Sequence, residues 1–518
     1  MRLERKEILL YAGFLLAVLP VLLTRDFTPG NELRYLSIAD EALRNHTFFA
    51  FTNHGVPYAD KPPLYLWLVM LCKAVTGGHH MWLLALFSVL PAIGVVITMD
   101  RWSRESMGQA MRPVARMMLL TAGLFVGSAL TLRMDMLMCL FIVLALHQFW
   151  KMQQEPACGS ARWLFPVYLF LAVFTKGPLG LLIPLCSTLA YLAVTGRLRQ
   201  AFRYWGWRTW GVMLLPLLLW VGAIYLESGT DYLQNLFIHQ TVDRGINSFH
   251  HNRPFYYYLV CIWYCLAPWM FVAVGAVVGS LRPKCPRGDL QTFFLTVAVT
   301  SFVLLSVISS KLQIYMLPAV PFMVYAAVMA LPRVERSGWV RVALAVPAVI
   351  FATALPGVLV ASGNEKLSYL ADWPILAAAL AVTCAGLWSL AALWRTPQDG
   401  TYIGRVARRM GGGLLAAVFL AGWALPRMNA DLGFAKLCEK TMEIARERGI
   451  TDVRTWDISR SDNMDVYLGH DVTVIPKDSL PPTGGAEPYL LLTRSRRLSR
   501  FPGRQTLSLG KYAIVVCP

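Results

Sequence analysis

Long runs of apolar residues recur along this chain and are separated by short polar segments. Crossing the hydrocarbon core of a bilayer takes about 20 apolar residues as an α-helix, and runs such as Ile8 to Leu23, His80 to Met99 and Val340 to Val360 meet or approach that length. The pattern therefore predicts about thirteen transmembrane helices. Their predicted ranges are 8–24, 80–100, 116–132, 135–150, 161–175, 178–196, 208–226, 255–280, 289–308, 314–332, 340–361, 373–394 and 411–425.

The composition leads to the same prediction. Of 518 residues, 56% are hydrophobic and 15% are charged, which is typical of a chain whose solvent is mostly lipid. The net charge of +18 would suit nucleic acid, but the basic residues lie in short loops between the apolar runs and not on one face or in a tail. No small-residue cleavage site follows the first apolar run, so we interpret it as a retained anchor and not as a signal peptide.

The basic residues indicate the topology. With the N-terminus inside, six loops hold twenty basic residues, and the four short loops on the other side hold one each. The six loops contain Arg101, Arg104, Arg112, Arg116, Lys151, Arg162, Arg197, Arg199, Arg203, Arg208, Arg282, Lys284, Arg287, Arg333, Arg336, Arg341, Arg395, Arg405, Arg408 and Arg409. The short outer loops contain Arg133, Lys176, Lys311 and Lys366. A span from Pro63 to Gly77 would invert every later loop, so that stretch is predicted to be an interfacial or re-entrant helix.

This topology divides the chain after residue 425. Residues 1–425 are predicted to form an all-α polytopic membrane domain, with a first outer loop at 25–79 and a second at 227–254. Residues 426–518 are predicted to form a small α/β domain outside the membrane, with a helix at 434–448 and strands at 472–475, 489–492 and 512–516. Cys438 and Cys517 are the only cysteines of that domain; an oxidising periplasm would permit a disulfide, and two buried free thiols are the alternative.

Polar and ionisable side chains that the topology rule does not explain gather on the predicted outer side. Ionisable groups at membrane depth indicate a functional cavity, although any single one can be a snorkelling or loop residue. Arginine offers a two-pronged donor, lysine a mobile charge and tyrosine a hydroxyl, and together these suit phosphate. The set is Asn31, Glu32, Arg34, Lys61, Arg133, Asp135, Lys176, His239, Arg244, His251, Arg253, Lys311 and Tyr315.

Several common reaction classes find no support in the sequence. It contains no His-Glu-x-x-His, Gly-x-Ser-x-Gly or Walker motif, so a metalloprotease, a serine hydrolase and an ATP-driven pump are not indicated. His250 and His251 are adjacent but lack further residues at metal-ligand spacing, and no metal site is predicted from them.

Five segments in register resemble one family. They are Asn31-Glu-Leu-Arg-Tyr35, Lys61-Pro-Pro63, Phe174-Thr-Lys-Gly-Pro178, His251-Asn-Arg-Pro-Phe-Tyr-Tyr257 and Lys311-Leu-Gln-Ile-Tyr-Met-Leu-Pro318. They resemble motifs of the lipid A aminoarabinose transferases and of related protein O-mannosyltransferases, which are glycosyltransferases of the GT-C class. Tyr467-Leu-Gly469 in the tail is similar too. The resemblance spans most of the chain and implies a GT-C fold.

The resemblance also implies an activity and a site. The family moves a sugar from a polyprenyl phosphate, such as undecaprenyl phosphate, to an acceptor at the periplasmic face of the bacterial inner membrane, with the lipid-linked sugar as co-substrate and no other cofactor expected. Residue by residue, it nominates Arg34, Lys61 and Tyr315 as phosphate-binding groups and adds Lys176, His251 and Lys311 as further candidates. Tyr35 either contacts substrate or packs against the loop.

The candidate catalytic residues are Asn31, Glu32 and Asp135, and the first departs from the family pattern, which has an acidic residue there. A further departure is Asp60, where the lipid A enzymes have Glu. Asp135 either meets the sugar, orients Lys61 or is a helix N-cap paired with Arg133.

The amide at position 31 bears on the acceptor, because an amide cannot serve as a base. A phosphate monoester is already ionised near neutral pH, whereas a Ser or Thr hydroxyl must lose a proton. The sequence therefore favours a lipid acceptor such as a lipid A phosphate. Protein O-glycosyl transfer, with Glu32 or Asp135 as base, is the alternative. A lipid-linked sugar transporter is less favoured, since the polar residues lie at one surface and no internal repeat is visible.

Overall fold

The computed structural model describes residues 4–155, 158–236, 253–280, 287–335, 337–395, 401–479, 481 and 488–517. The chain forms two compact units. Unit 1 comprises Met1–Leu19, Ala59–Tyr65 and Ala85–Ala421, and unit 2 comprises Pro20–Tyr58, Leu66–Leu84 and Gly422–Pro518. The predicted division after residue 425 stays a prediction.

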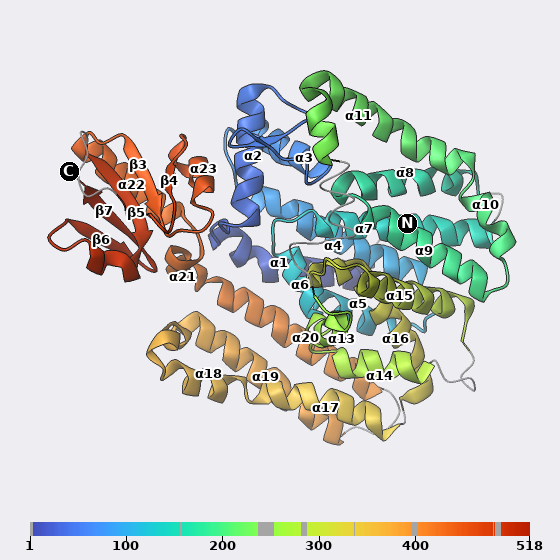
Figure 1. Ribbon diagram of the computed structural model, residues 1–518. Helices are drawn as coiled ribbons and strands as arrows, with labels where there is room; N and C mark the ends of the chain where they lie inside the picture. Colours follow the sequence, from blue (N-terminus) through green and yellow to red (C-terminus); the bar gives the residue numbers. More distant parts are fainter. Residues whose placement is uncertain are drawn as a thin grey trace. The chain divides into compact units, whose positions relative to one another are not determined.

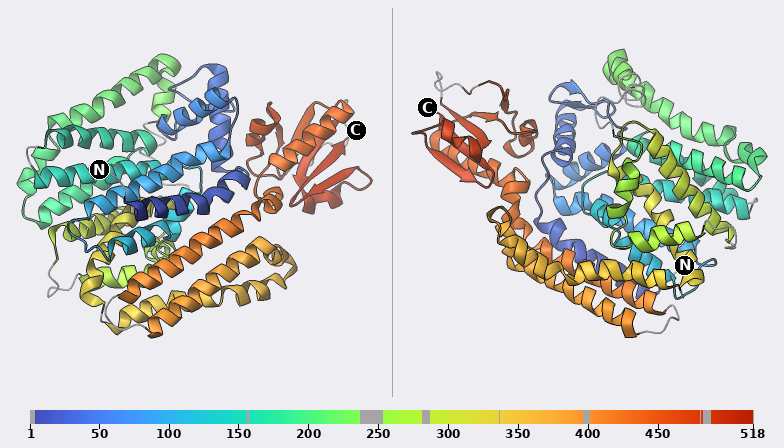
Figure 2. Two further views of the ribbon diagram at one scale, coloured as in Figure 1. Left: turned by 180° about the vertical axis from the view of Figure 1, so that it is seen from behind. Right: turned by 60° about the horizontal axis from the view of Figure 1, so that its bottom comes forward.

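Helices make up most of the chain, and Figures 1 and 2 show the long helices of unit 1, such as α17, α19 and α20, running side by side. The helices are α1 (Arg5–Thr24), α2 (Asn31–Asn45), α3 (Leu64–Thr76), α4 (Met81–Trp102), α5 (Arg112–Leu120), α6 (Gly123–Ala129), α7 (Asp135–Gln154), α8 (Gly159–Lys176), α9 (Leu179–Val194), η1 (Leu198–Gln200), α10 (Ala201–Tyr204), α11 (Trp207–Gln234), α13 (Tyr257–Cys265), α14 (Met270–Ser280), α15 (Asp289–Val307), η3 (Gln313–Ala319), α16 (Val320–Val334), α17 (Gly338–Ala352), α18 (Ala354–Ser362), η4 (Glu365–Ala371), α19 (Trp373–Arg395), α20 (Thr401–Gly422), α21 (Leu425–Leu432), α22 (Ala435–Arg448), η5 (Ser461–Met464), α23 (Asp465–Leu468) and η6 (Ser495–Arg500).

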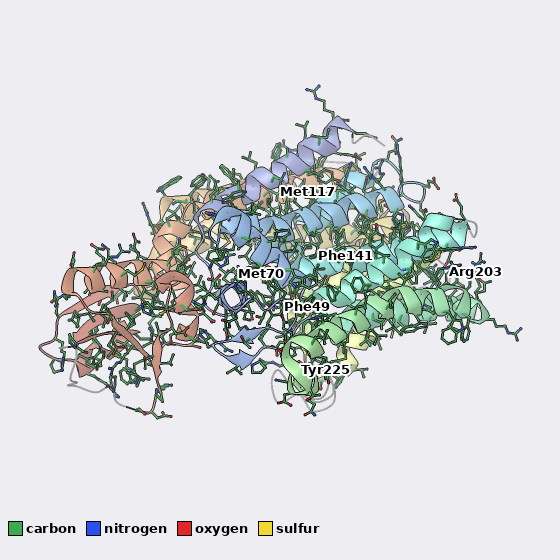
Figure 3. The ribbon with its side chains drawn as sticks, turned by 90° about the horizontal axis from the view of Figure 1, so that it is seen from above. Phe49, Met70, Met117, Phe141, Arg203 and Tyr225 are labelled. Carbon is green, nitrogen blue, oxygen red and sulfur yellow. The ribbon has the colours of Figure 1, made fainter. Side chains whose placement is uncertain are left out.

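The helices confirm a multi-span membrane protein. Among the described residues, 8 helices are long and apolar enough to cross a membrane, or up to 10 if each of two bent pairs is one span. Every predicted range holds a helix or consecutive helices, but the predicted number of about thirteen spans is not confirmed. The stretch predicted as an interfacial helix is α3, whose Trp67 packs edge-on against Phe49 at 5.9 Å between ring centroids. Phe49 and Met70 of this region are labelled in Figure 3.

Two predicted spans are broken for local reasons. The range 255–280 divides into α13 and α14, which are bent by 119° with Pro268 between them, because proline cannot donate the hydrogen bond that a continuous helix needs. The range 116–132 divides into α5 and α6. There the N–H of Gly123 donates to Ala267 O at 2.8 Å, and a Cβ at this glycine would lie 2.7 Å from Tyr264 O. Only glycine permits this close approach between α6 and α13.

Two arginines predicted to lie in an inner loop are instead buried in unit 1. Arg116 donates to Glu7 at 2.8 Å, and Arg112 donates through Nε to Asp100 at 3.2 Å. All four residues are less than 10% exposed. Buried charges need such partners, so the network fixes α1, α4 and α5 against one another.

Unit 2 contains a five-stranded sheet, as predicted for the C-terminal α/β region. Its strands are β3 (Asp452–Trp456), β4 (Thr473–Ile475), β5 (Tyr489–Arg494), β6 (Thr506–Leu509) and β7 (Tyr512–Cys517), in the order β4-β3-β5-β7-β6. Strand β3 runs parallel to β4 and β5, whereas β7 is antiparallel to β5 and β6. Trp456, Tyr489, Leu491, Phe501, Val515 and Cys517 form the core on one face.

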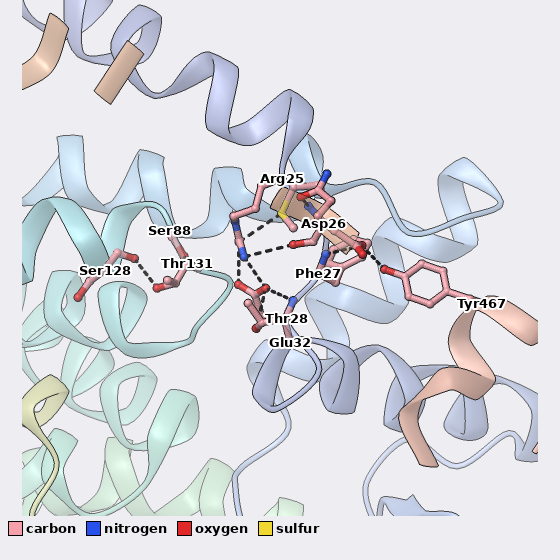
Figure 4. A network of polar contacts seen from close by, with 11 residues as sticks. Arg25, Asp26, Phe27, Thr28, Glu32, Ser88, Ser128, Thr131 and Tyr467 are labelled. Atoms are coloured by element: carbon pink, nitrogen blue, oxygen red, sulfur yellow. Dashed lines mark hydrogen bonds and ion pairs between the residues drawn. The ribbon is translucent and has the colours of Figure 1, made fainter. Parts of the chain in front are cut away.

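The sheet module is joined to the loop after α1 within unit 2. Asp26, 9% exposed, accepts a hydrogen bond of 2.9 Å from the N–H of Ala435 at the start of α22. The same carboxylate accepts a hydrogen bond from the hydroxyl of Tyr467, and Figure 4 shows this contact. The tail motif that begins at Tyr467 therefore has a structural partner in the loop between α1 and α2.

The two cysteines of the C-terminal region do not form a disulfide. Cys438 in α22 and Cys517 in β7 are both free and buried, at 0% and 1% exposure. Cys517 lies in the apolar core of the sheet, and burial raises the pKa of the Cys438 thiol. Of the two alternatives raised by the sequence, the structure contains the buried free thiols.

Candidate active site

The loop between α1 and α2 is held by a carboxylate in the first turn of α2. Glu32, 2% exposed, accepts two hydrogen bonds of 2.8 Å from the guanidinium of Arg25. It also accepts hydrogen bonds from the N–H and the hydroxyl of Thr28, at 2.8 and 3.0 Å (Figure 4). The positive end of the helix dipole favours a carboxylate here. With both oxygens occupied, Glu32 is arranged to fix the loop and not to take a proton from a substrate.

Arg34 extends from the same end of α2 and is oriented by two neighbours. Its Nη2 donates to Asn31 Oδ1 at 2.9 Å, and its guanidinium carbon lies 5.5 Å from the centroid of the Tyr58 ring. Its Nε is buried and has no hydrogen-bond partner within the described part of the chain. A guanidinium that is oriented but not fully hydrogen-bonded suits a phosphate. Tyr35 is only 4% exposed, which favours its packing role.

A second group of candidates lies in unit 1, around Asp135 at the start of α7. Asp135 is 1% exposed, and its carboxylate accepts hydrogen bonds from Arg133 Nε at 3.1 Å and from Lys176 Nζ. Lys176 also lies over the ring of Tyr315, at 4.6 Å from the centroid. The N-cap of α7 is Met134, so Asp135 is inside the helix and the N-cap interpretation is wrong, whereas the pairing with Arg133 is confirmed.

Lys311 and Lys61 complete the cations of unit 1 that the motifs nominate. Lys311, 3% exposed, donates to Ile308 O at 2.5 Å, and no carboxylate pairs with it among the residues that the structure describes. Burial lowers the pKa of Lys311, because the charged form is poorly solvated there. Lys61 is half-buried, with its Nζ 3.4 Å from Asp60 O. A buried ammonium without a counter-ion favours an anionic ligand.

A cavity of about 610 Å³ lies beside this group in unit 1. Arg133 lines it and also holds Asp135, and Leu312, another lining residue, accepts a hydrogen bond of 3.1 Å from the hydroxyl of Tyr258. The volume is in the range of small-molecule sites. The cavity is lined by Gly123, Leu124, Gly127, Ser128, Thr131, Arg133, Tyr257, Tyr264, Cys265, Leu312, Gln313 and Ile314.

The predicted site residues divide into three groups: those of unit 1, those of unit 2 and those outside the described residues. Lys176 contacts both Asp135 and Tyr315 within unit 1, where Lys61 and Lys311 also lie. Asn31, Glu32, Arg34 and Tyr35 belong to unit 2. His239, Arg244 and His251, with most of the predicted second outer loop, lie outside the described residues. Arg253 is described and exposed.

Some residues of this region were missed by sequence reasoning. One of them is Arg25, which directly follows the first apolar run and pairs with Glu32. Ion pairing across a loop has no sequence signature, so this partner could not be predicted. Ser128, Thr131 and Gln313 line the cavity. Their small or neutral side chains carry no chemical signal until the fold places them together.

Comparison with known proteins gives relatives across most of the chain. No family model matches. The undecaprenyl phosphate-α-4-amino-4-deoxy-L-arabinose arabinosyl transferase of Edwardsiella ictaluri is 28% identical over 320 residues, which are 59% of this chain and 56% of that protein. The enzyme of the same name from Shewanella sediminis is 24% identical over 432 residues, covering 81% of this chain and 76% of that protein. The match to the first relative thus spans only about half of its length.

A solved structure decides the fold. The crystal structure of ArnT from Cupriavidus metallidurans bound to undecaprenyl phosphate aligns with 99% of this chain and 98% of its own, with a TM-score of 0.75 at 18% identity. This chain has the ArnT fold. The apo form of the same ArnT gives a TM-score of 0.74. The predicted GT-C fold with a C-terminal sheet module is confirmed, and so is the resemblance to the aminoarabinose transferases.

Proposed function

We propose that this protein is a glycosyltransferase that moves a sugar from a polyprenyl phosphate to a phosphate of a lipid acceptor such as lipid A. The observation that carries the proposal is that a chain with the ArnT fold retains the cationic and aromatic motif residues Arg34, Lys61 and Tyr315. The named relatives act on undecaprenyl phosphate-linked aminoarabinose, so this sugar is the first donor to test.

The proposed chemistry is a single displacement. An oxygen of the acceptor phosphate forms a bond to the anomeric carbon as the bond from that carbon to the polyprenyl phosphate oxygen breaks, and the polyprenyl phosphate leaves with the electron pair. Its growing negative charge needs fixed cations. This is the role proposed for Lys61 and Lys311 of unit 1, and the motif resemblance nominates Arg34 as a further phosphate-binding group. In-line attack inverts the anomeric configuration.

The carboxylates support a phosphate acceptor over a hydroxyl acceptor. Both oxygens of Glu32 accept hydrogen bonds from Arg25, and the carboxylate of Asp135 is shared between Arg133 and Lys176. A carboxylate paired in this way is a poor base, because its cations stabilise the ionised form. We therefore assign Glu32 to loop structure and Asp135 to the orientation of Lys176, with Asn31 orienting Arg34.

The proposed location is the bacterial inner membrane, with the site and the C-terminal module on the periplasmic side. Its support is the distribution of basic residues over the predicted loops. Accessibility of engineered single cysteines in intact cells, at Lys366 for the outer side and at Arg199 for the inner side, tests this orientation.

The mass of lipid A from a deletion strain tests the function. We expect loss of one glycosyl substituent from lipid A and its return when the intact gene is supplied. The mass difference names the sugar. Unchanged lipid A, together with loss of a glycosyl group from membrane proteins, would replace this proposal by protein O-glycosyl transfer.

A further inference from the structure

Three side chains with no part in the proposed transfer converge within unit 2. His54 lies in the turn between β1 (Thr52–Asn53) and β2 (Val56–Pro57), Asp465 begins α23, and Asp471 follows that helix. Each offers one possible metal-ligand atom, and these atoms lie within 4.8 Å of one another. His54 Nδ1 and Asp471 Oδ1 are 3.4 Å apart. This separation matches the edge of a tetrahedron around zinc with bonds of about 2.0 to 2.1 Å.

The carboxylate of Asp465 is buried and only partly hydrogen-bonded. It is 4% exposed, and its Oδ2 accepts a hydrogen bond of 2.8 Å from the hydroxyl of Ser37. Among the described residues, its buried Oδ1 has no hydrogen-bond partner. In the part of the chain that the structure describes, no lysine or arginine pairs with Asp465 or Asp471. A buried carboxylate left in this state is costly, and a bound cation would remove the cost.

The surrounding hydrogen bonds orient the possible ligands. Ser37 Oγ lies 3.4 Å from His54 Nε2 while it donates to Asp465, so a proton on Nε2 leaves the Nδ1 lone pair for a metal. One helical turn further along α2, Glu41 accepts hydrogen bonds from the N–H groups of His54 (2.6 Å) and Gly55 (2.9 Å). Both turn residues have positive φ, 52° and 74°, as a two-residue hairpin turn requires. Glu41 thus fixes the turn that presents His54.

We propose that His54, Asp465 and Asp471 bind a divalent transition-metal ion, with zinc the best match. One imidazole nitrogen and two carboxylates suit zinc, whereas calcium prefers a shell made of oxygens. Two carboxylates and a neutral imidazole carry a charge of about −2, which a divalent ion neutralises. Asp471 is 72% exposed at its side chain and can turn toward the ion. Water fills the remaining position.

The consequence is a cross-link inside unit 2. The ligands come from residues 54, 465 and 471, so one ion would fasten the hairpin of the first outer loop to the C-terminal module. Sequence reasoning missed the site because its ligands are separated by about 400 residues and match no metal-binding spacing.

The test uses the full-length protein in detergent, stripped with EDTA and then titrated with zinc alone. After free metal is removed, we expect wild-type protein to retain one more zinc ion per chain than either His54→Ala or Asp465→Asn. Ser37→Ala should weaken zinc binding by about 10- to 100-fold, because it removes the group that orients two ligands. His470→Ala is the matched control, since His470 is exposed beside Asp471, and it should bind zinc as wild type does.

Hydrogen–deuterium exchange supplies a second readout that does not depend on total metal content. Zinc should slow exchange in peptides covering residues 52–57 and 465–471 of the wild-type protein and of His470→Ala, but not of His54→Ala. Calcium should not reproduce this protection. Equal zinc content in wild type, His54→Ala and Asp465→Asn, or equal exchange with and without zinc in the wild-type protein, would overturn the proposal.

Discussion

Arg25 binds the carboxylate of Glu32 through two hydrogen bonds of 2.8 Å, and the side chains are only 11% and 3% exposed. A pair buried in this way is sensitive to loss of one partner, because the remaining charge is left unpaired in a poorly solvated place. The pair therefore governs the shape of the loop that begins α2, which also carries Asn31 and Arg34.

Arg25→Ala should destabilise the protein by about 3 kcal/mol, since it strands the Glu32 carboxylate. Glu32→Gln should cost less, because an amide oxygen can still accept from Thr28. Thermal unfolding of the purified protein measures both effects. Arg44→Ala, which removes an exposed arginine from the last turn of α2, is the control and should leave the unfolding temperature unchanged. An equally small effect of Arg25→Ala would show that the pair does not hold the loop.

Variants of Lys176 and Asp135, which are in contact, distinguish a structural role of Lys176 from a role in the reaction. Lys176→Met should destabilise the protein by about 3 kcal/mol, because it removes one of the two cations that hold the buried Asp135 carboxylate, and adding Asp135→Asn should restore part of the loss by removing the buried negative charge. If Lys176 also serves the reaction, the stable double variant should still be about 100-fold slower than wild type. Lys366→Ala, which removes an exposed lysine of η4, controls for loss of charge. Full activity in the double variant would make Lys176 purely structural.

Arg34→Ala and Lys61→Ala should each lower the rate of transfer by about 10- to 100-fold while the protein still inserts into the membrane, since each loses a charge-assisted contact of about 1.5 to 3 kcal/mol. Arg34→Lys should lower the rate of transfer as well, because lysine cannot reproduce the planar guanidinium that contacts Asn31 and the Tyr58 ring. Initial rates with a labelled polyprenyl-linked sugar give the comparison. Rates near wild type in both alanine variants would remove these residues from the site.

Asp457 should make a pH-dependent contribution to the stability of the C-terminal module. Hydrogen bonds from Arg497 (2.8 Å) and Arg496 (3.1 Å) lower the pKa of Asp457 below its ordinary value. A carboxyl whose pKa is lowered on folding stabilises the fold above its unfolded pKa of about 3.9, and this stability is lost as the pH falls through the lowered value. Asp457→Asn should therefore weaken the module at pH 7, and its difference from wild type should shrink below about pH 4.

Hydrogen exchange of peptides from β5 and β7, corrected for intrinsic rates at each pH, measures this difference. Asp478→Asn, at an exposed carboxylate, should match wild type throughout. A difference between Asp457→Asn and wild type that stays constant from pH 7 to below pH 4 would assign the effect to packing and not to charge.

The helices could be predicted because each apolar run is itself the physical cause of a span. The breaks could not. The bend between α13 and α14 occurs beside Pro268, yet proline also lies within helices such as α4, so its effect depends on packing that a sequence does not display. The burial of Arg112 and Arg116 was hidden for the same reason, since Glu7 and Asp100 reach them from other helices.

For the site, the motifs nominated the residue types and the structure supplied their partners. Resemblance nominated Lys176, Asp135 and Tyr315 from three separate segments, and Lys176 contacts both of the others. The sequence left open whether Glu32 acts as a base. Its ion pair with Arg25 supports the structural role proposed above, because a carboxylate's availability as a base depends on its partners and not on its type.

The most direct test of the central claim is transfer by the purified protein from undecaprenyl phosphate-linked aminoarabinose to lipid A, followed by mass spectrometry and ³¹P NMR of the product. The proposed function predicts lipid A heavier by one aminoarabinose, with the sugar on a phosphate, with inverted anomeric configuration, and with release of one undecaprenyl phosphate per transfer. Absence of product from lipid A, with glycosylation of a Ser- or Thr-containing peptide from the same donor, would contradict it.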